Sequence, residues 1–125
     1  MVKQLILVGL GGGIGSILRY LTSLATRPFN SRSFPVATFT ANIVGCLLIG
    51  VFLAMFGQNT PSQQNLKLLF ITGFCGGYTT FSAFAAENMS LIQNQQFGVA
   101  VGYTVASMAG GLLAVGLGYV LVRQG

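Results

Sequence analysis

The stretch Gly-Phe-Cys-Gly-Gly-Tyr-Thr-Thr-Phe-Ser-Ala-Phe, residues 73–84, lies in the middle of a long apolar run from Leu66 to Ile92. Gly costs about 1 kcal/mol against Ala inside a helix, and Thr can divert backbone hydrogen bonds, so this is a poor helix centre. Inside a membrane, non-helical backbone persists only where protein or a water-filled cavity satisfies it. We therefore expect a broken helix whose free carbonyls can bind a cation, with a simple kink or a close-packed glycine pair as the alternative.

The composition of the whole chain points to lipid as its solvent. Of 125 residues, 53% are hydrophobic and 6% are charged, and the mean hydropathy is +0.76. A soluble domain has roughly 25% charged residues. The chain has no His, and Glu87 is its one acidic residue. These counts exclude a water-soluble monomer, the usual zinc sites and most acid–base enzymes, so we expect a protein that is not an enzyme.

Four apolar segments are each long enough to cross about 30 Å of hydrocarbon. They lie near residues 4–26, 35–56, 66–92 and 97–122, and lack the period of two that barrel strands require. Three polar connections separate them, at residues 27–34, 57–65 and 93–96. The connection at 57–65 has the composition of a turn throughout. The connection at 93–96 is so short that the helices on either side of it must be antiparallel neighbours. The expected fold is an all-α membrane protein, a single four-helix domain over residues 1–125.

Basic residues are almost evenly divided between the two ends of these segments. The side that holds both termini and the second connection carries Lys3, Lys67 and Arg123. The opposite side carries Arg27 and Arg32, with Arg19 close to it. Because the Lys/Arg bias sets the orientation of a membrane protein, this chain has little reason to choose one orientation. We expect insertion both ways, followed by antiparallel pairing.

Neutral polar side chains recur at helical spacing inside three of the segments. The pairs are Thr38/Asn42, Thr79/Ser82 and Tyr103/Ser107, and Phe81 and Phe84 are spaced in the same way. A path lined by hydroxyl and amide donors suits an anion, because each donor replaces part of the ion's hydration shell. The alternative is that these groups join helices through interhelical hydrogen bonds.

Two charged residues and two cysteines also lie inside the segments. Arg19 either attracts anions or extends its side chain to the lipid headgroups. Glu87 is expected to pair with a basic residue or to bond the helix break, with proton carriage as the alternative. Cys46 and Cys75 are expected to be free thiols rather than a disulfide.

Glycines in the first segment have the spacing of close helix contacts. The pairs Gly9/Gly13 and Gly11/Gly15 fit the small-xxx-small pattern that lets two backbones approach. The run 8–15 does not contain the G-x-G-x-x-G spacing of a dinucleotide loop. Helix packing is therefore the expected role of these glycines.

Three motifs carry a resemblance that covers essentially the whole chain. They are Gly-Ser-Ile-Leu-Arg-Tyr at 15–20, Thr-Phe-Thr-Ala-Asn-Ile-Val-Gly at 38–45, and the stretch 73–84 with its specific Gly-Gly-x-Thr-Thr-Phe-Ser core. The chain resembles the small fluoride channels called Fluc, also known as CrcB. The resemblance implies an antiparallel, dual-topology homodimer in the cell inner (plasma) membrane. It also implies two pores that let fluoride leave the cytoplasm down its electrochemical gradient, which protects against fluoride toxicity.

The resemblance also assigns roles to individual residues. Main-chain carbonyls of Gly76 and Thr79 from both subunits would hold a structural Na⁺ ion at the dimer two-fold axis. The positions that match the fluoride pore are Asn42, Phe81, Phe84, Thr38, Ser82, Tyr103 and Ser107, with Arg19 near its entrance. Ala83 and Gly111 depart from the pattern, because many members have Thr at the first position and some have Ser at the second. Both changes remove a hydroxyl, so the polar path is expected to be shorter or wetter.

Two other classes of function fit part of these observations. A proton-coupled four-helix exporter, similar to the small multidrug transporters, is also compact and can have dual topology. Such a protein normally needs a carboxylate in its first helix, where this chain has none, so Glu87 would have to serve. A purely structural subunit would need no more than the glycine-rich helices. Fluoride efflux without a proton gradient distinguishes a channel from both.

Overall fold

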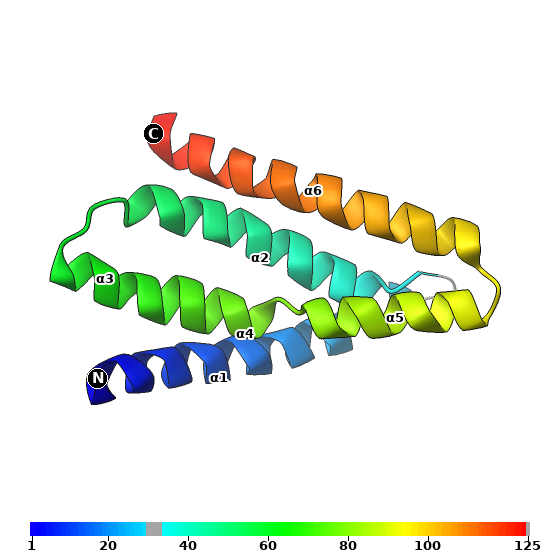
Figure 1. The fold of residues 1–125 in the computed structure, drawn as a ribbon, viewed down its shortest axis with the longest axis horizontal. Helices are drawn as coiled ribbons and strands as arrows, with labels where there is room; N and C mark the ends of the chain where they lie inside the picture. The colour runs from blue at the N-terminus through cyan, green and yellow to red at the C-terminus, as the bar shows by residue number, and fades with distance from the viewer. Residues whose placement is uncertain (30–33, 125) are drawn as a thin grey trace.

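The computed structural model describes residues 1–29 and 34–124, and its helices run up and down along one long axis (Figure 1). Helix α1 (Val2–Ala25) is followed by the short η1 (Arg27–Phe29) and by α2 (Val36–Met55). The third pass consists of α3 (Pro61–Lys67), the π-helical η2 (Leu68–Cys75), α4 (Gly76–Tyr78) and α5 (Phe81–Gln93). Helix α6 (Phe97–Gln124) is the fourth pass. Both termini and the α2–α3 connection lie at one end, and the α5–α6 connection lies at the other.

Within residues 1–29 and 34–124, four helical passes are long and apolar enough to cross a membrane. They are Val2–Ala25, Val36–Met55, Pro61–Gln93 and Phe97–Gln124. The prediction of an all-helical chain with four such passes is confirmed. The third pass is broken between α4 and α5, as the Gly and Thr pairs predicted, and Figure 1 shows the ribbon straightening there. Arg32, one of the basic residues in the charge comparison, lies outside the described residues.

The third pass begins at Pro61 rather than at Leu66, so the prediction of a turn over the whole of 57–65 is wrong at its end. Pro occupies the first position of α3, where its missing N–H costs nothing. The hydroxyl of Thr60 accepts a hydrogen bond from the backbone N–H of Gln63 at 3.3 Å and caps the helix. The Thr-Pro pair at 60–61 is therefore the start of a helix, although the polar composition of 57–65 suggested a turn.

Glycines bring the backbone of α1 against that of the third pass. A Cβ atom on Gly11 would collide with the backbone of Leu69, and one on Gly15 with the backbone of Phe74. Gly9 and Gly13 have open space at the same position. The small-xxx-small prediction is thus confirmed for Gly11/Gly15 and wrong for Gly9/Gly13 within one chain. Lipid supplies no hydrophobic drive between helices, so this close approach supplies the packing that holds the break in place.

Glycines also bring the backbone of α2 against that of α6. A Cβ atom on Gly50 would collide with the backbone of Val115, and one on Gly118 with the backbone of Leu47. Near the other end of α6, the fully buried ring of Tyr103 packs against Phe34, Phe39 and Phe84. The glycine contacts and this aromatic cluster fix α2, α5 and α6 around the break.

We expect Gly15→Ala to lower the free energy of unfolding and Gly13→Ala to leave it unchanged or raised. The added methyl group at position 15 meets backbone that cannot move aside, and overpacking of this kind costs about 1–3 kcal/mol. At position 13 the methyl group meets open space, while Ala is favoured over Gly in a helix by about 1 kcal/mol. Unfolding of the two variants and the wild type in mixed detergent measures the difference. Equal stabilities would contradict the packing of α1 described here.

Candidate ion pathway

The break in the third pass is two residues long and has extended backbone. Thr79 has φ −87° and ψ 158°, and Thr80 has φ −151° and ψ 120°. The side chain of Asn42 on α2 bonds both backbone groups of Thr80: its Oδ1 accepts from the N–H at 2.8 Å, and its Nδ2 donates to the carbonyl at 3.1 Å. One amide side chain therefore satisfies the N–H and the carbonyl of Thr80, which would otherwise have no hydrogen-bond partner inside a membrane.

Side-chain bonds at the break also release two carbonyls. In an unbroken helix the Thr80 N–H would donate to the carbonyl of Gly76, but here it donates to Asn42. The Ala83 N–H would donate to the carbonyl of Thr79, but it donates to the Thr80 hydroxyl at 3.1 Å. Gly76 is exposed on the surface of the chain. The two carbonyls expected to hold Na⁺ are thus the two that lose their helical donors to side chains, and their oxygens suit a hard cation.

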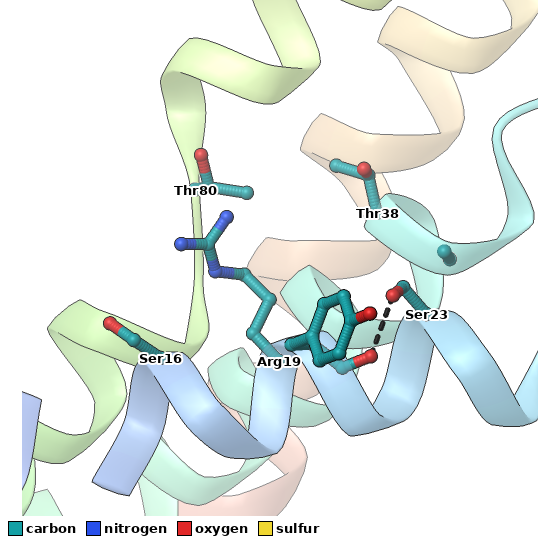
Figure 2. A pocket seen from close by; sticks show the side chains of 7 residues that line it. Ser16, Arg19, Ser23, Thr38 and Thr80 are labelled. Carbon is teal, nitrogen blue, oxygen red and sulfur yellow. Dashed lines mark hydrogen bonds between the residues drawn. The ribbon is translucent and has the colours of Figure 1, made fainter. Parts of the chain in front are cut away.

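Arg19 reaches the same region from α1. Its Nε donates to the carbonyl of Gly77 at 3.2 Å, so the guanidinium is drawn inward to the break rather than toward the end of the helix. It lines a cavity of about 220 Å³ together with Thr38, Thr80 and two serines, Ser16 and Ser23. Figure 2 shows the guanidinium beside Thr80, with Ser16 and Thr38 on either side. We call this the Arg19 pocket.

A second cavity, of about 280 Å³, borders the Asn42–Thr80 contact, and both residues line it. Its lining includes Asn42, Thr80, Phe81, Phe84 and Ser107, and we call it the phenylalanine pocket. The rings of Phe81 and Phe84 lie 5.7 Å apart at an angle of 38°. The hydroxyl oxygen of Ser107 is buried and has no hydrogen-bond partner among the residues that the structure describes. Thr80 lines both pockets, so both border the break.

Glu87 on α5 joins three helices through hydroxyl groups. Its Oε2 accepts from the Thr38 hydroxyl at 2.9 Å, and its Oε1 accepts from the Tyr103 hydroxyl at 3.3 Å. Among the described residues, its carboxylate bonds neither a Lys or Arg nor the break. The expected bond to the break is therefore wrong, while pairing with Arg32, which lies outside the described residues, stays a prediction. The bonds from two hydroxyls are charge-assisted and stabilise the carboxylate.

The structure divides the predicted pore residues into groups. Arg19 and Thr38 lie in the Arg19 pocket, while Asn42, Phe81, Phe84 and Ser107 line the phenylalanine pocket. Tyr103 and Ser82 line neither: Tyr103 is 0% exposed, and Ser82 is exposed with its hydroxyl 3.2 Å from that of Thr80.

The sequence did not lead us to expect Thr80, Ser16 and Ser23 beside Arg19, yet all three line its pocket. Ser16 lies three residues before Arg19 and Ser23 four after it, so their shared face was visible as helical spacing.

Comparison with known proteins places this arrangement in a family. A family model described as CrcB-like protein, Camphor Resistance (CrcB), matches residues 6–119. The chain belongs to the CrcB family. A fluoride-specific ion channel FluC of Flavobacterium psychrophilum is 44% identical to it over 98% of this chain and 99% of the relative. FluC proteins of Azobacteroides pseudotrichonymphae and Gloeothece citriformis are 43% and 40% identical, each over 98% of both chains. The resemblance drawn from the three sequence motifs is confirmed.

Proposed function

We propose that this CrcB chain is a fluoride-selective ion channel and not an enzyme. The relatives that match nearly its full length are named fluoride-specific ion channels, which supplies the identity of the ion. The observation that carries the proposal in the structure is the pair of pockets that meet at Thr80. The cationic Arg19 lines one pocket, and the aromatic residues Phe81 and Phe84 line the other.

The two pockets offer an anion different kinds of stabilisation. In the Arg19 pocket the guanidinium attracts the ion, and the hydroxyls of Ser16 and Thr80 replace part of its hydration shell. In the phenylalanine pocket the positive edges of Phe81 and Phe84 stabilise fluoride without a fixed cation that would trap it. Conduction requires binding that is firm enough for entry and weak enough for exit, and this sequence of sites meets both conditions.

The arrangement of acidic groups favours a channel over the proton-coupled exporter. Helix α1 carries no carboxylate, and Glu87 lines neither pocket. Both Glu87 oxygens are bonded to hydroxyls that join α2, α5 and α6. Fluoride therefore moves down its own electrochemical gradient, and outward flow across the inner membrane protects the cytoplasm from the ion.

The functional unit is an antiparallel homodimer with two pores. Ser82 and Gly76 are exposed at the depth of the break, where lipid would leave polar groups unsatisfied. The ring of Phe81 is 79% exposed. A second copy in the opposite orientation would cover these groups, and the nearly even distribution of Lys and Arg permits both orientations.

A structural Na⁺ ion lies at the centre of this dimer. The carbonyls of Gly76 and Thr79, freed of their helical donors, would hold it from both subunits. No carboxylate is present at the break, which favours a singly charged ion over Ca²⁺. The ion joins the two chains and offsets the repulsion between fluoride ions in neighbouring pores.

Fluoride efflux from proteoliposomes tests this function. A channel releases fluoride down its gradient when the inner and outer pH are equal. A proton-coupled exporter requires a pH gradient, and a structural subunit releases no fluoride under either condition.

A further inference from the structure

Cys46 is a thiol in the wall of the phenylalanine pocket that the proposed function does not use. It lies on α2 one turn after Asn42, it is half-buried, and the cavity lining includes it together with Met108. The other cysteine, Cys75, is 0% exposed and lines neither described pocket. The chain therefore offers two thiols in one membrane domain, of which one borders a cavity.

Two further contacts place the Cys46 sulfur against α6. A Cβ atom built on Gly111 would lie 3.3 Å from Sγ of Cys46, so the thiol occupies the space that a side chain at 111 would fill. One turn before Gly111, Ser107 lines the same cavity. Two sulfur-containing residues, Cys46 and Met108, thus line one space of about 280 Å³.

We propose that Cys46 is a modification site for small thiophilic reagents and that its modification closes the fluoride path; this inference rests on the proposed function. Sulfur ligands select soft metal ions, and the Met108 thioether is a second soft ligand in the same cavity. Mercuric chloride is the probe, because it is small and neutral. The Cys46 sulfur forms a bond to mercury, one Hg–Cl bond breaks, the thiol proton goes to water and chloride leaves, without change of oxidation state. The bound mercury then occupies the space between Asn42, Ser107 and the two phenylalanines.

The experiment compares fluoride efflux before and after mercuric chloride in reconstituted wild type, Cys46→Ser and Cys75→Ala. We expect efflux of the wild type and Cys75→Ala to fall to that of protein-free liposomes, and dithiothreitol to restore it. Efflux of Cys46→Ser should be the same with and without the reagent. Cys46→Ala serves in the same comparison if the serine variant does not fold. Block that persists without Cys46, or that is lost with Cys75, would overturn the proposal.

Intact-mass measurement of the treated proteins separates this inference from the proposed function. A mercury adduct on the wild type and Cys75→Ala, but not on Cys46→Ser, supports Cys46 as the reactive thiol even if the untreated protein passes no fluoride. In that case the proposed function fails, and with it the claim of block. An adduct on Cys46 with undiminished efflux overturns the block alone. The absence of an adduct overturns the modification site.

Discussion

Replacement of Phe81 or Phe84 by Ile is expected to reduce fluoride efflux at least about tenfold, which corresponds to about 1.4 kcal/mol on the barrier. Ile retains apolar bulk but has no positive ring edge to stabilise the anion. Phe81 is 79% exposed, so its replacement removes little packing within one chain. Phe84 lies 5.0 Å from the ring of Tyr103, so its replacement also removes an aromatic contact. Efflux is therefore measured per folded protein, after size-exclusion chromatography.

Phe52→Ile is the matched control for the loss of a ring. Phe52 packs against Phe56 and Phe70, with ring centroids 5.9 Å and 5.1 Å away, and lines neither the Arg19 pocket nor the phenylalanine pocket. Its replacement should lower stability without lowering efflux per folded protein. If all three variants keep the efflux of the wild type, the two phenylalanines belong to helix packing and not to an ion path.

Removal of Na⁺ is expected to destabilise the assembled protein strongly. A ligand present at 100 times its dissociation constant stabilises the folded state by about 2.7 kcal/mol, and an ion shared by two chains also stabilises their association. Replacing Na⁺ by N-methyl-D-glucamine at constant ionic strength should lower the melting temperature in detergent and increase the fraction of monomer. Return of Na⁺ should reverse both changes with a saturable dependence.

Thr80→Val provides a structural control for the cation site. Loss of the hydroxyl removes the cap of α5 and leaves the Ala83 N–H without its acceptor, which weakens the extended backbone at Thr79 and Thr80. A weakened break holds the Thr79 carbonyl less firmly, so the stabilising effect of Na⁺ should be smaller in the variant than in the wild type. Melting and monomer fraction that do not respond to Na⁺ in the wild type would contradict the site.

The break in the third pass was predictable because its cause is local. Adjacent glycines and adjacent threonines weaken a helix wherever they occur, and Thr80 is also a good cap for the next one. The spans were predictable for a similar reason, since length and hydropathy decide them. The start of α3 was missed because the polar composition of 57–65 outweighed a Thr-Pro helix start that the sequence also contains.

Partners across helices were not predictable, because spacing along one helix does not fix what faces it. Asn42 was expected to line a pore, and nothing in its segment indicates that both amide atoms bond Thr80. The two hydroxyl partners of Glu87 come from different helices and depend on how α2, α5 and α6 meet. Gly9/Gly13 and Gly11/Gly15 have the same spacing, and the rotation of α1 alone decides which pair is covered.

Fluoride efflux under controlled ionic conditions tests the central claim most directly. Purified protein is reconstituted in liposomes loaded with potassium fluoride, diluted into a fluoride-free medium at the same neutral pH, and followed with a fluoride electrode. Valinomycin supplies the counter-flow of K⁺. We expect rapid fluoride release on addition of valinomycin, no dependence on a pH gradient, and retention of chloride in liposomes loaded with potassium chloride. Fluoride that stays inside until a pH gradient is imposed, or until detergent opens the liposomes, would contradict it.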